Sequence, residues 1–305
     1  MTNIDLVFVA DAGDAGVRLD VFVSENIPHL TRSFLKKHID SGLVTVNGKP
    51  EKAGCKLKEA DIVKMTEPEE IIPDILPEAI SLEIVYEDDD IIIVDKPKGM
   101  VVHPAAGHYN GTLVNALMYH CKGRLSAING VLRPGIVHRI DMNTSGLIMA
   151  AKNDIAHKSL SEQLSARSVK KIYEALTINV IKDDVFQINQ PIGRSERDRK
   201  KMRVTDKNSK EAITNIKVTE RFRANTLIEA ELITGRTHQI RVHLAHLGYP
   251  LLGDTVYGPE RCKHKITGQA LFARTLGICH PKTGEYMEFE TKRPEYMEKI
   301  LQSLR

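Results

Sequence analysis

Between residues 15 and 66, the spacing of apolar side chains changes from a helical period to an extended one. Residues 19–23 and 34–39 each carry apolar side chains on one helical face, and Thr31 is suited to cap the second helix. Two later segments have the length and composition of strands, with a tight-turn sequence between them. They are residues 43–46, which the tight-turn sequence Asn47-Gly48 follows directly, and residues 61–65 further along the chain. The pattern predicts two helices followed by a small sheet.

A proline-rich acidic stretch follows this unit. Residues 67–78 contain three prolines and five acidic residues. Because proline fixes φ and lacks a backbone donor, such a stretch is typical of an extended connector. We therefore predict a small N-terminal domain over residues 15–66, a linker over residues 67–80 and a larger domain over residues 81–305.

Beyond the linker, the pattern predicts more strands than helices. An acidic turn at residues 87–90 separates two apolar segments, 82–86 and 91–94, which indicates a hairpin. Further strands are predicted over residues 171–179, 212–219 and 225–232, and helices over residues 111–120, 154–167 and 237–247. The mixture predicts an α+β fold whose sheet is mixed and largely antiparallel.

The composition is that of a globular protein with a sizeable core. Hydrophobic residues make up 42% and charged residues 27% of the 305-residue chain, which is ordinary for such proteins. No basic leader precedes an apolar run at the N-terminus, and the longest apolar stretches are far too short to cross a bilayer. The four cysteines form no CxxC pair, which favours reduced thiols. We expect a cytoplasmic, monomeric protein without membrane contact.

Charge is distributed unevenly along the chain. Residues 1–90 carry nine basic and nineteen acidic residues, whereas residues 91–305 carry 34 basic and 21 acidic ones. Within the first part, residues 17–66 carry nine basic and six acidic residues, so the acidic excess lies in the leader and the connector. Two basic bodies indicate a polyanionic partner, although an ordinary solvated surface produces the same balance.

A polar island stands between two apolar runs within residues 135–150. This pattern is typical of a loop held by buried strands, where functional side chains are often placed. Asp141 lies in the island, close to Arg139. A structural ion pair between the two is the simpler interpretation, because such networks also hold carboxylates.

A second polar cluster, residues 234–246, combines a glycine-containing helix entry with several arginines and histidines. Its Arg236 and Arg241 are suited to pair with Asp141 and to keep that acid ionised. A carboxylate nucleophile needs this protonation state. The histidines do not form an HExxH pattern and no cysteine pair accompanies them, so we expect no metal site.

The N-terminal unit resembles the α-L RNA-binding module. The matching residues are Arg18-Leu19-Asp20, Thr31-Arg32-Ser33, Gly42 to Lys49 and Leu57 to Ile62, with Ala60 where the family usually has Gly. The resemblance implies RNA binding through phosphate contacts from a helix face and an adjacent turn. The candidate contacts are Arg32, Lys36, Lys37 and Lys49. An ordinary solvated helix face is the alternative interpretation of these charges.

Motifs in the larger domain resemble those of the RluA/RluD family of pseudouridine synthases, and their arrangement is closest to the RluD branch. The HRLD-x-x-T-S-G signature is matched by residues 138–146, with Ile140 in place of Leu. Residues 235–241 match GRTHQIR without change, residues 171–176 match K-x-Y-x-A-L, and residues 96–104 match the family's first motif. The resemblance covers essentially the whole chain.

This resemblance assigns roles to individual residues. It implies that Asp141 is the catalytic aspartate, that Tyr173 packs on the target base and that Arg241 is the partner of the aspartate. His138 and Arg139 are expected to shape the loop or contact RNA. From the residues alone, Tyr173 is a core aromatic in a strand and Arg241 a charge on a helix surface. Pseudouridine formation breaks a glycosidic bond, turns the uracil and rejoins it through carbon. This reaction has no redox step, so no cofactor is expected. The target base lies inside a folded RNA, so it must leave the RNA stack to be reached.

A third basic segment lies between these motifs. Six of the ten residues 194–203 are basic. We interpret the segment as a mobile loop or hairpin tip that grips the RNA backbone, with a solvated charge run as the common alternative. Its candidate RNA contacts are Arg194, Arg199 and Lys201, and Arg236 of the second polar cluster is expected to join them.

The RluD branch implies large-subunit (23S) ribosomal RNA as the substrate and a part in ribosomal RNA processing. Transfer RNA is the second candidate. A non-catalytic RNA-binding protein of ribosome assembly would use the same surfaces, but it would not need Asp141, Tyr173 and Arg241 together. The sequence therefore predicts an isomerase that converts uridine to pseudouridine in structured RNA.

Overall fold

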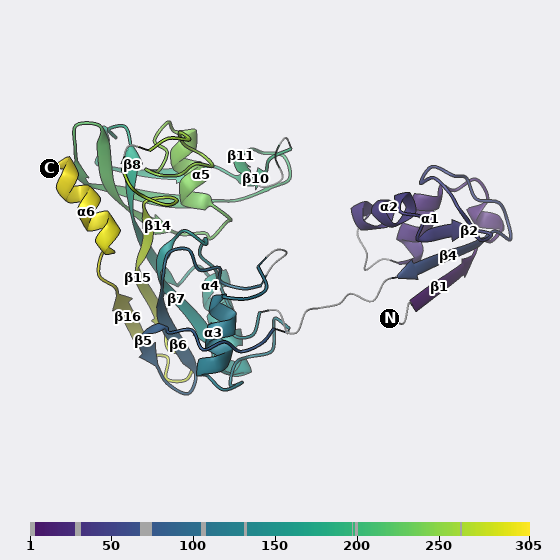
Figure 1. Cartoon of the computed structure of the whole chain (residues 1–305), viewed down its shortest axis with the longest axis horizontal. Helices are drawn as coiled ribbons and strands as arrows, with labels where there is room; N and C mark the ends of the chain where they lie inside the picture. Colours follow the sequence, from purple (N-terminus) through teal and green to yellow (C-terminus); the bar gives the residue numbers. More distant parts are fainter. Residues whose placement is uncertain are drawn as a thin grey trace. The chain divides into compact units, whose positions relative to one another are not determined.

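Two units follow one another along the chain, Met1–Pro73 and Asp74–Arg305 (Figure 1). The computed structural model describes residues 4–27, 32–67, 75–104, 108–130, 133–196, 198, 201–262 and 264–305. At positions 4, 32–34 and 67 the description covers the backbone alone. Half of the predicted linker, residues 68–74, lies outside the described residues, as does the predicted helix cap Thr31.

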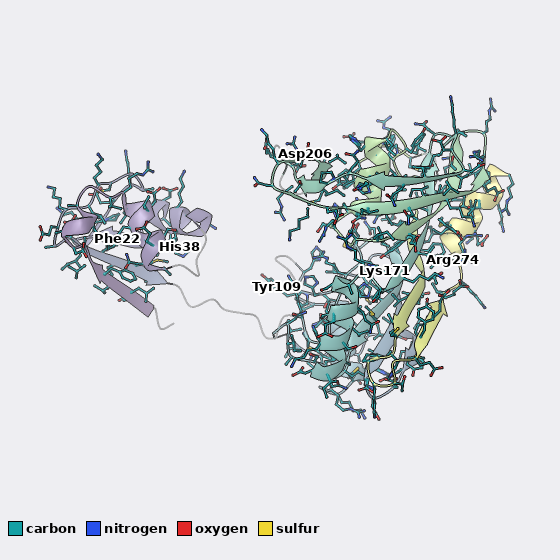
Figure 2. All side chains as sticks on the ribbon, turned by 180° about the vertical axis from the view of Figure 1, so that it is seen from behind. Phe22, His38, Tyr109, Lys171, Asp206 and Arg274 are labelled. Carbon is teal, nitrogen blue, oxygen red and sulfur yellow. The ribbon has the colours of Figure 1, made fainter. Side chains whose placement is uncertain are left out.

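The N-terminal unit packs two helices against a four-stranded antiparallel sheet with the strand order β1-β4-β2-β3. Its elements are β1 Ile4–Val9, the short 3-10 helix Ala12–Asp14, α1 Leu19–Asn26, α2 Arg32–Asp40, β2 Val44–Val46, β3 Lys49–Pro50 and β4 Ile62–Glu67. Phe22, labelled in Figure 2, is fully buried in its core together with Leu19 and Leu35. The two predicted helices and the two predicted strands are confirmed, whereas β1 was not predicted.

One turn of this unit bears on its resemblance to the RNA-binding module. Ala60 stands where that family usually has Gly, and it adopts a φ of 70°. This is the left-handed conformation that glycine takes without strain. The turn therefore keeps a glycine-like backbone, and its amide donates to the carbonyl of Ala10 at 2.9 Å.

The larger unit is built on a nine-stranded sheet. Its order is β5-β6-β7-β15-β8-β14-β13-β9, with β16 paired to β15. The strands are β5 Glu83–Glu87, β6 Ile91–Lys96, β7 Ser145–Ala151, β8 Lys170–Ile178, β9 Val185–Asn189, β13 Ile213–Arg221, β14 Asn225–Leu232, β15 Leu271–Cys279 and β16 Tyr286–Glu290. Among the described strands only β7 and β15 pair in parallel. The predicted α+β fold with a mixed, largely antiparallel sheet is confirmed.

Helices cover both faces of this sheet. On one face, the apolar side chains of α3 Leu113–His120 and α5 Gln239–His246 pack with Tyr173 and other residues of β6, β7, β8 and β14. On the other face lie α4 Asp154–Ser165 and α6 Glu295–Leu304. The three helices predicted in this unit are confirmed, each within a few residues at its ends. Thr112 and Asn153 cap α3 and α4 by accepting from backbone amides of the first turn.

A small three-stranded sheet stands beside α5. Its order is β11-β10-β12, formed by β10 Ile192–Arg194, β11 Met202–Val204 and β12 Ser209–Lys210. The segment between β10 and β11 is the basic stretch predicted as a loop or hairpin tip. Ile192 and Met202 pack with Val242 of α5. None of the described helices has the length and apolar character needed to cross a membrane.

Candidate active site

The loop that carries Asp141 is fixed by buried side chains on both sides. His138 accepts, through Nε2, a hydrogen bond from the Met149 amide at 3.1 Å, which ties the loop to β7. Burial, with a smaller contribution from the charge of Lys171, lowers the pKa of His138 to about 3. The imidazole is therefore neutral at ordinary pH and holds the loop as a hydrogen-bond acceptor.

The far end of the loop is held by a buried lysine. The Nζ atom of Lys96 donates to the carbonyls of Pro97, Met100 and Met142 at 2.8, 2.9 and 3.2 Å. The Met142 carbonyl, one residue beyond Asp141, also accepts from the Gly99 amide at 2.9 Å. Burial lowers the pKa of Lys96 to about 7, although the charges of Asp141 and Asp95 raise it. The segment of residues 96–100 thus supports the loop of Asp141 through hydrogen bonds to the Met142 carbonyl.

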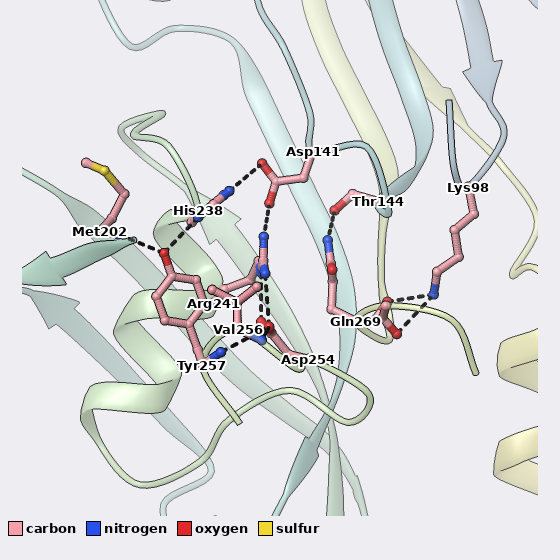
Figure 3. A network of polar contacts seen from close by, with 11 residues as sticks. Lys98, Asp141, Thr144, Met202, His238, Arg241, Asp254, Val256, Tyr257 and Gln269 are labelled. Carbon is pink, nitrogen blue, oxygen red and sulfur yellow. Dashed lines mark hydrogen bonds and ion pairs between the residues drawn. The ribbon is translucent and has the colours of Figure 1, made fainter. Parts of the chain in front are cut away.

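A third support comes from the start of β15. Gln269 donates through Nε2 to the hydroxyl of Thr144 at 3.0 Å, and Lys98 donates to the carbonyl of Gln269 at 2.8 Å (Figure 3). Directly after Thr144, the strand β7 runs very close to β15. A Cβ atom at Gly146 would lie 2.2 Å from the carbonyl oxygen of Ala273. Only glycine allows this approach.

Asp141 is paired with Arg241 of α5, as the motifs predicted. Arg241 Nη1 donates to Asp141 Oδ2 at 2.9 Å. The other edge of the same guanidinium is bidentate with Asp254, whose oxygens lie 2.7 and 2.9 Å from Nε and Nη2 (Figure 3). The Asp254 side chain is fully buried, and Oδ1 also accepts from the amides of Val256 and Tyr257.

These contacts decide the charge and the orientation of Arg241. Burial on its own would lower the pKa of Arg241, but the hydrogen bonds and charges of Asp254 and Asp141 together raise it. The guanidinium stays charged and cannot rotate without breaking two charge-assisted bonds to Asp254. It therefore presents one N–H group to Asp141 in a fixed direction.

His238 approaches Asp141 from the helix start. Its Nε2 lies 3.8 Å from Asp141 Oδ1, and its Nδ1 lies 2.7 Å from the hydroxyl of Tyr257. That hydroxyl accepts from the Met202 amide at 2.9 Å, which leaves its own proton for Nδ1 of the histidine. Burial lowers the pKa of His238 more than the charge of Asp141 raises it. The neutral ring thus directs an Nε2–H group towards the carboxylate of Asp141. The backbone of His238 is left-handed, with a φ of 58°.

These groups line a cavity of about 440 Å³. Asp141, Arg241 and Tyr173 of β8 all line it, and Tyr173 belongs to the same apolar cluster as Ile140 and Leu271. Tyr173 is 7% exposed, and burial followed by the charge of Asp141 raises its pKa, so its hydroxyl is neutral. The remaining lining includes Val137, Thr144, Leu164, Lys171, Leu232, Ile233 and Thr234. The cavity therefore has the side chain of Asp141 and the aromatic ring of Tyr173 in one lining.

The structure brings together six residues predicted for the site. Asp141, Tyr173, Arg241, His138, Arg139 and Arg236 all line the cavity. Arg139 is exposed, whereas Arg236 is partly buried and donates from Nε to the Glu211 carbonyl at 2.8 Å. The other predicted RNA contacts lie elsewhere. Arg194 and Lys201 are on the β10–β11 hairpin, and Lys36, Lys37 and Lys49 are on the N-terminal unit, the last three exposed. Arg199 and the side chain of Arg32 lie outside the described residues.

Four supporting residues were not predicted from the sequence, namely Asp254, His238, Tyr257 and Lys96. The sequence did hold one signal for Asp254. It follows the apolar residues Leu251 and Leu252, and a carboxylate in such a segment is costly to bury without a cationic partner. His238 lies inside the predicted GRTHQIR motif, but its left-handed backbone depends on the packing of α5 and could not be predicted.

Comparisons with known proteins agree with this geometry. Residues 90–246 match the family model for RNA pseudouridylate synthase, and residues 17–63 match that of the S4 domain. The chain is 48% identical over 305 residues to an RNA pseudouridine synthase of Bacillus subtilis (strain 168), which covers 100% of this chain and 99% of the relative.

Two further similarities extend this result. Ribosomal large subunit pseudouridine synthase D of Pseudomonas aeruginosa is 44% identical over 308 residues, covering 95% of this chain and 92% of the relative. The solved structure of human RNA pseudouridylate synthase domain containing 1 has a TM-score of 0.58 at 25% identity, covering 74% of this chain and 96% of that one. The sequence relatives span both units of the chain.

Proposed function

Since the chain belongs to the RNA pseudouridylate synthase family and is an isomerase that acts on RNA, we propose that it modifies specific uridines of large-subunit (23S) ribosomal RNA, with Asp141 as the catalytic carboxylate. The resemblances to this family and to the N-terminal RNA-binding module are confirmed. The substrate is supported by the relative named for the ribosomal large subunit, which aligns over 95% of this chain.

The observation that carries the catalytic proposal is the placement of Asp141. Its side chain is 18% exposed, lines a concave cavity and accepts a hydrogen bond from Arg241 at 2.9 Å. A uridine stacked inside an RNA helix cannot bring its glycosidic bond to such a site. We therefore propose that the target base flips out of the stack and packs on Tyr173, which offsets part of the lost stacking.

The reaction requires no group that the chain lacks. The C1′–N1 bond breaks with its electron pair going to the base, the uracil turns, and a C1′–C5 bond forms. The proton at C5 is then lost and N1 gains one, so substrate and product have the same atoms. The Asp141 carboxylate can add to C1′, add to the base or remove a sugar proton. All three routes use the carboxylate oxygens of Asp141, one of which Arg241 orients by its hydrogen bond.

We assign binding of the surrounding RNA to basic residues in the lining of the cavity and outside it. Arg139 and Arg236 line the cavity, and Arg194 and Lys201 lie on the β10–β11 hairpin. The Met202 amide of this hairpin donates to Tyr257, so the hairpin is anchored to the site itself. Lys36, Lys37 and Lys49 supply further phosphate contacts from the N-terminal unit.

The substitution Asp141→Asn tests the catalytic assignment. It keeps the shape of the side chain and removes its charge, so single-turnover formation of pseudouridine should fall at least about 10³-fold. RNA affinity should change less than about threefold, since phosphate contacts dominate it. Asp206→Asn is the matched control, because Asp206 is an exposed acid of the same unit (Figure 2). A fully active D141N protein contradicts the assignment.

The substrate is tested with the same variants in cells. Cells that lack this protein should lose pseudouridines from a large-subunit ribosomal RNA loop, and mapping should show that the wild-type chain restores them while D141N does not. Unchanged ribosomal RNA together with altered transfer RNA would assign the enzyme to the second candidate substrate. Loss from neither RNA would contradict both.

A further inference from the structure

Among the described residues, the largely buried Lys171 of the active-site cavity has no ion-pair or hydrogen-bond partner. Lys171 precedes Tyr173 by two residues on β8, so both side chains lie on the same face of the strand and both line the cavity. Lys171 is 8% exposed. Within the part of the chain that the structure describes, its amine forms neither an ion pair nor a hydrogen bond. Burial lowers its pKa.

Neighbouring cations do have partners. Lys170, on the opposite face of β8, binds Glu288 at 2.9 Å. Arg167, at the end of α4, pairs with Glu211, and Arg241 binds two carboxylates. An unpaired buried ammonium group is costly, and a protein retains one where a ligand completes it. A lysine only donates hydrogen bonds, so the missing ligand must offer an acceptor or a negative charge.

The position of Lys171 in the cavity identifies which part of the ligand it meets. Asp141 and Lys171 both line the cavity with Tyr173; the charge of Asp141 acts on Tyr173, and the charge of Lys171 acts on His138. Two residues along a strand span about 6.6 Å, which is comparable to the width of a pyrimidine with its carbonyl oxygens. A base packed on Tyr173, with its sugar at Asp141, therefore directs its far edge towards the amine.

We propose that the Lys171 ammonium donates to a carbonyl oxygen of the flipped uracil and stabilises the charge of the departing base. This inference rests on the proposed function. When the C1′–N1 bond breaks, its electron pair leaves with the base, and the negative charge spreads over N1, O2 and O4. A fixed donor in a water-poor cavity favours that state over the neutral bound uridine. The charge disappears again when C1′–C5 has formed and C5 has lost its proton.

The first experiment tests the role of the Lys171 amine with substitutions at two neighbouring lysines of β8. Lys171→Met should reduce the single-turnover rate constant by about 10²-fold with RNA affinity within about threefold of wild type, because one donor to a developing charge is removed. Lys171→Arg should recover part of the rate, since it keeps the charge. Lys170→Met removes the adjacent lysine from the opposite face and should leave the rate unchanged. A K171M rate within threefold of wild type overturns the inference, and so does a loss found entirely in RNA affinity, which would indicate a phosphate contact.

The second experiment names the contacted atom. Substrate RNA carrying 4-thiouridine or 2-thiouridine at the target replaces one carbonyl oxygen by sulfur, a weaker hydrogen-bond acceptor. The sulfur at the contacted position should slow the wild-type enzyme and have no further effect in K171M. Equal effects in both proteins, at both positions, contradict the contact. If K171M does not fold, Lys171→Gln serves in its place. If the wild-type protein formed no pseudouridine in this RNA, the proposed function would be contradicted. Failure of the proposed function is therefore distinguishable from failure of the Lys171 contact.

Discussion

At the scale of single residues, the carboxylate that we propose as catalytic depends on partners of two kinds. Arg241 could be predicted as the partner of Asp141 because both stand in long family motifs. Asp254 could not, since its pairing with Arg241 depends on how the turn after α5 folds back under the helix. Yet Asp254 fixes the guanidinium through bonds of 2.7 and 2.9 Å. The direction in which Asp141 receives its hydrogen bond is therefore decided by a residue outside the motifs.

The buried imidazole of His138 makes the free energy of unfolding depend on pH. Its pKa is about 3 in the folded protein and about 6.5 in an unfolded chain. Between these values the unfolded state binds more protons, so the free energy of unfolding falls as the pH is lowered from 6.5. The fall is at most about 1.4 kcal/mol per pH unit for one proton. His138→Gln keeps an acceptor for the Met149 amide and removes the titration.

Urea unfolding of the larger unit, followed by circular dichroism at pH 7, 6 and 5, measures this effect. Wild type should lose stability more steeply than H138Q as the pH falls. The titration of His103, whose pKa burial lowers to about 4, occurs in both proteins and cancels in the comparison. Parallel pH profiles for the two proteins would show that His138 is not held neutral by the fold.

At the scale of elements, local pattern was sufficient where an element has a one-sided apolar face or a clear cap. The helices predicted over residues 111–120 and 154–167 are α3 and α4, which begin after Thr112 and Asn153. The strand β15 was missed, since it is buried from both sides at the centre of the sheet and shows no simple alternation. Its parallel pairing with β7 joins residues more than a hundred positions apart, which no local pattern encodes.

The β7–β15 pairing sets up a prediction at the element scale. Gly146→Ala places a Cβ atom 2.2 Å from the Ala273 carbonyl oxygen at a φ of 107°. The strands must separate or the backbone must turn, at an expected cost of about 3 kcal/mol or more. Because the loop of Asp141 leads directly into β7, activity at a temperature where the variant is still folded should also fall.

Gly284→Ala is the control for backbone strain alone. Gly284 has a φ of 73° in the turn before β16, and nothing lies within 4 Å of the added atom. Its cost should be about 1 kcal/mol, with activity unchanged. Thermal unfolding measures the stability of both variants, and turnover measures their activity. If G146A is no less stable than G284A, the close approach of β7 and β15 does not constrain the catalytic loop.

At the scale of the whole molecule, the proposed reacting groups lie in one unit, whereas the proposed RNA contacts lie in both. All six predicted residues that line the cavity belong to Asp74–Arg305. The N-terminal unit adds basic residues without adding a reacting group. The uneven charge along the sequence predicted two basic bodies, and charge alone did not distinguish RNA from an ordinary solvated surface. The S4 domain match supplies the missing identification for residues 17–63.

This division predicts that the N-terminal lysines contribute to affinity and leave the chemical rate unchanged. Replacing Lys36, Lys37 and Lys49 together by Gln should weaken RNA binding. The slope of log Kd against log salt concentration should fall by up to about 0.7 to 0.9 per lost phosphate contact, because fewer counterions are released. The single-turnover rate at saturating RNA should stay within twofold of wild type. The same change at the exposed Lys52, Lys56 and Lys58 removes equal charge from the same unit. If both triple variants alter the salt slope equally, net charge alone explains the effect, and the helix face and turn are not a specific RNA contact.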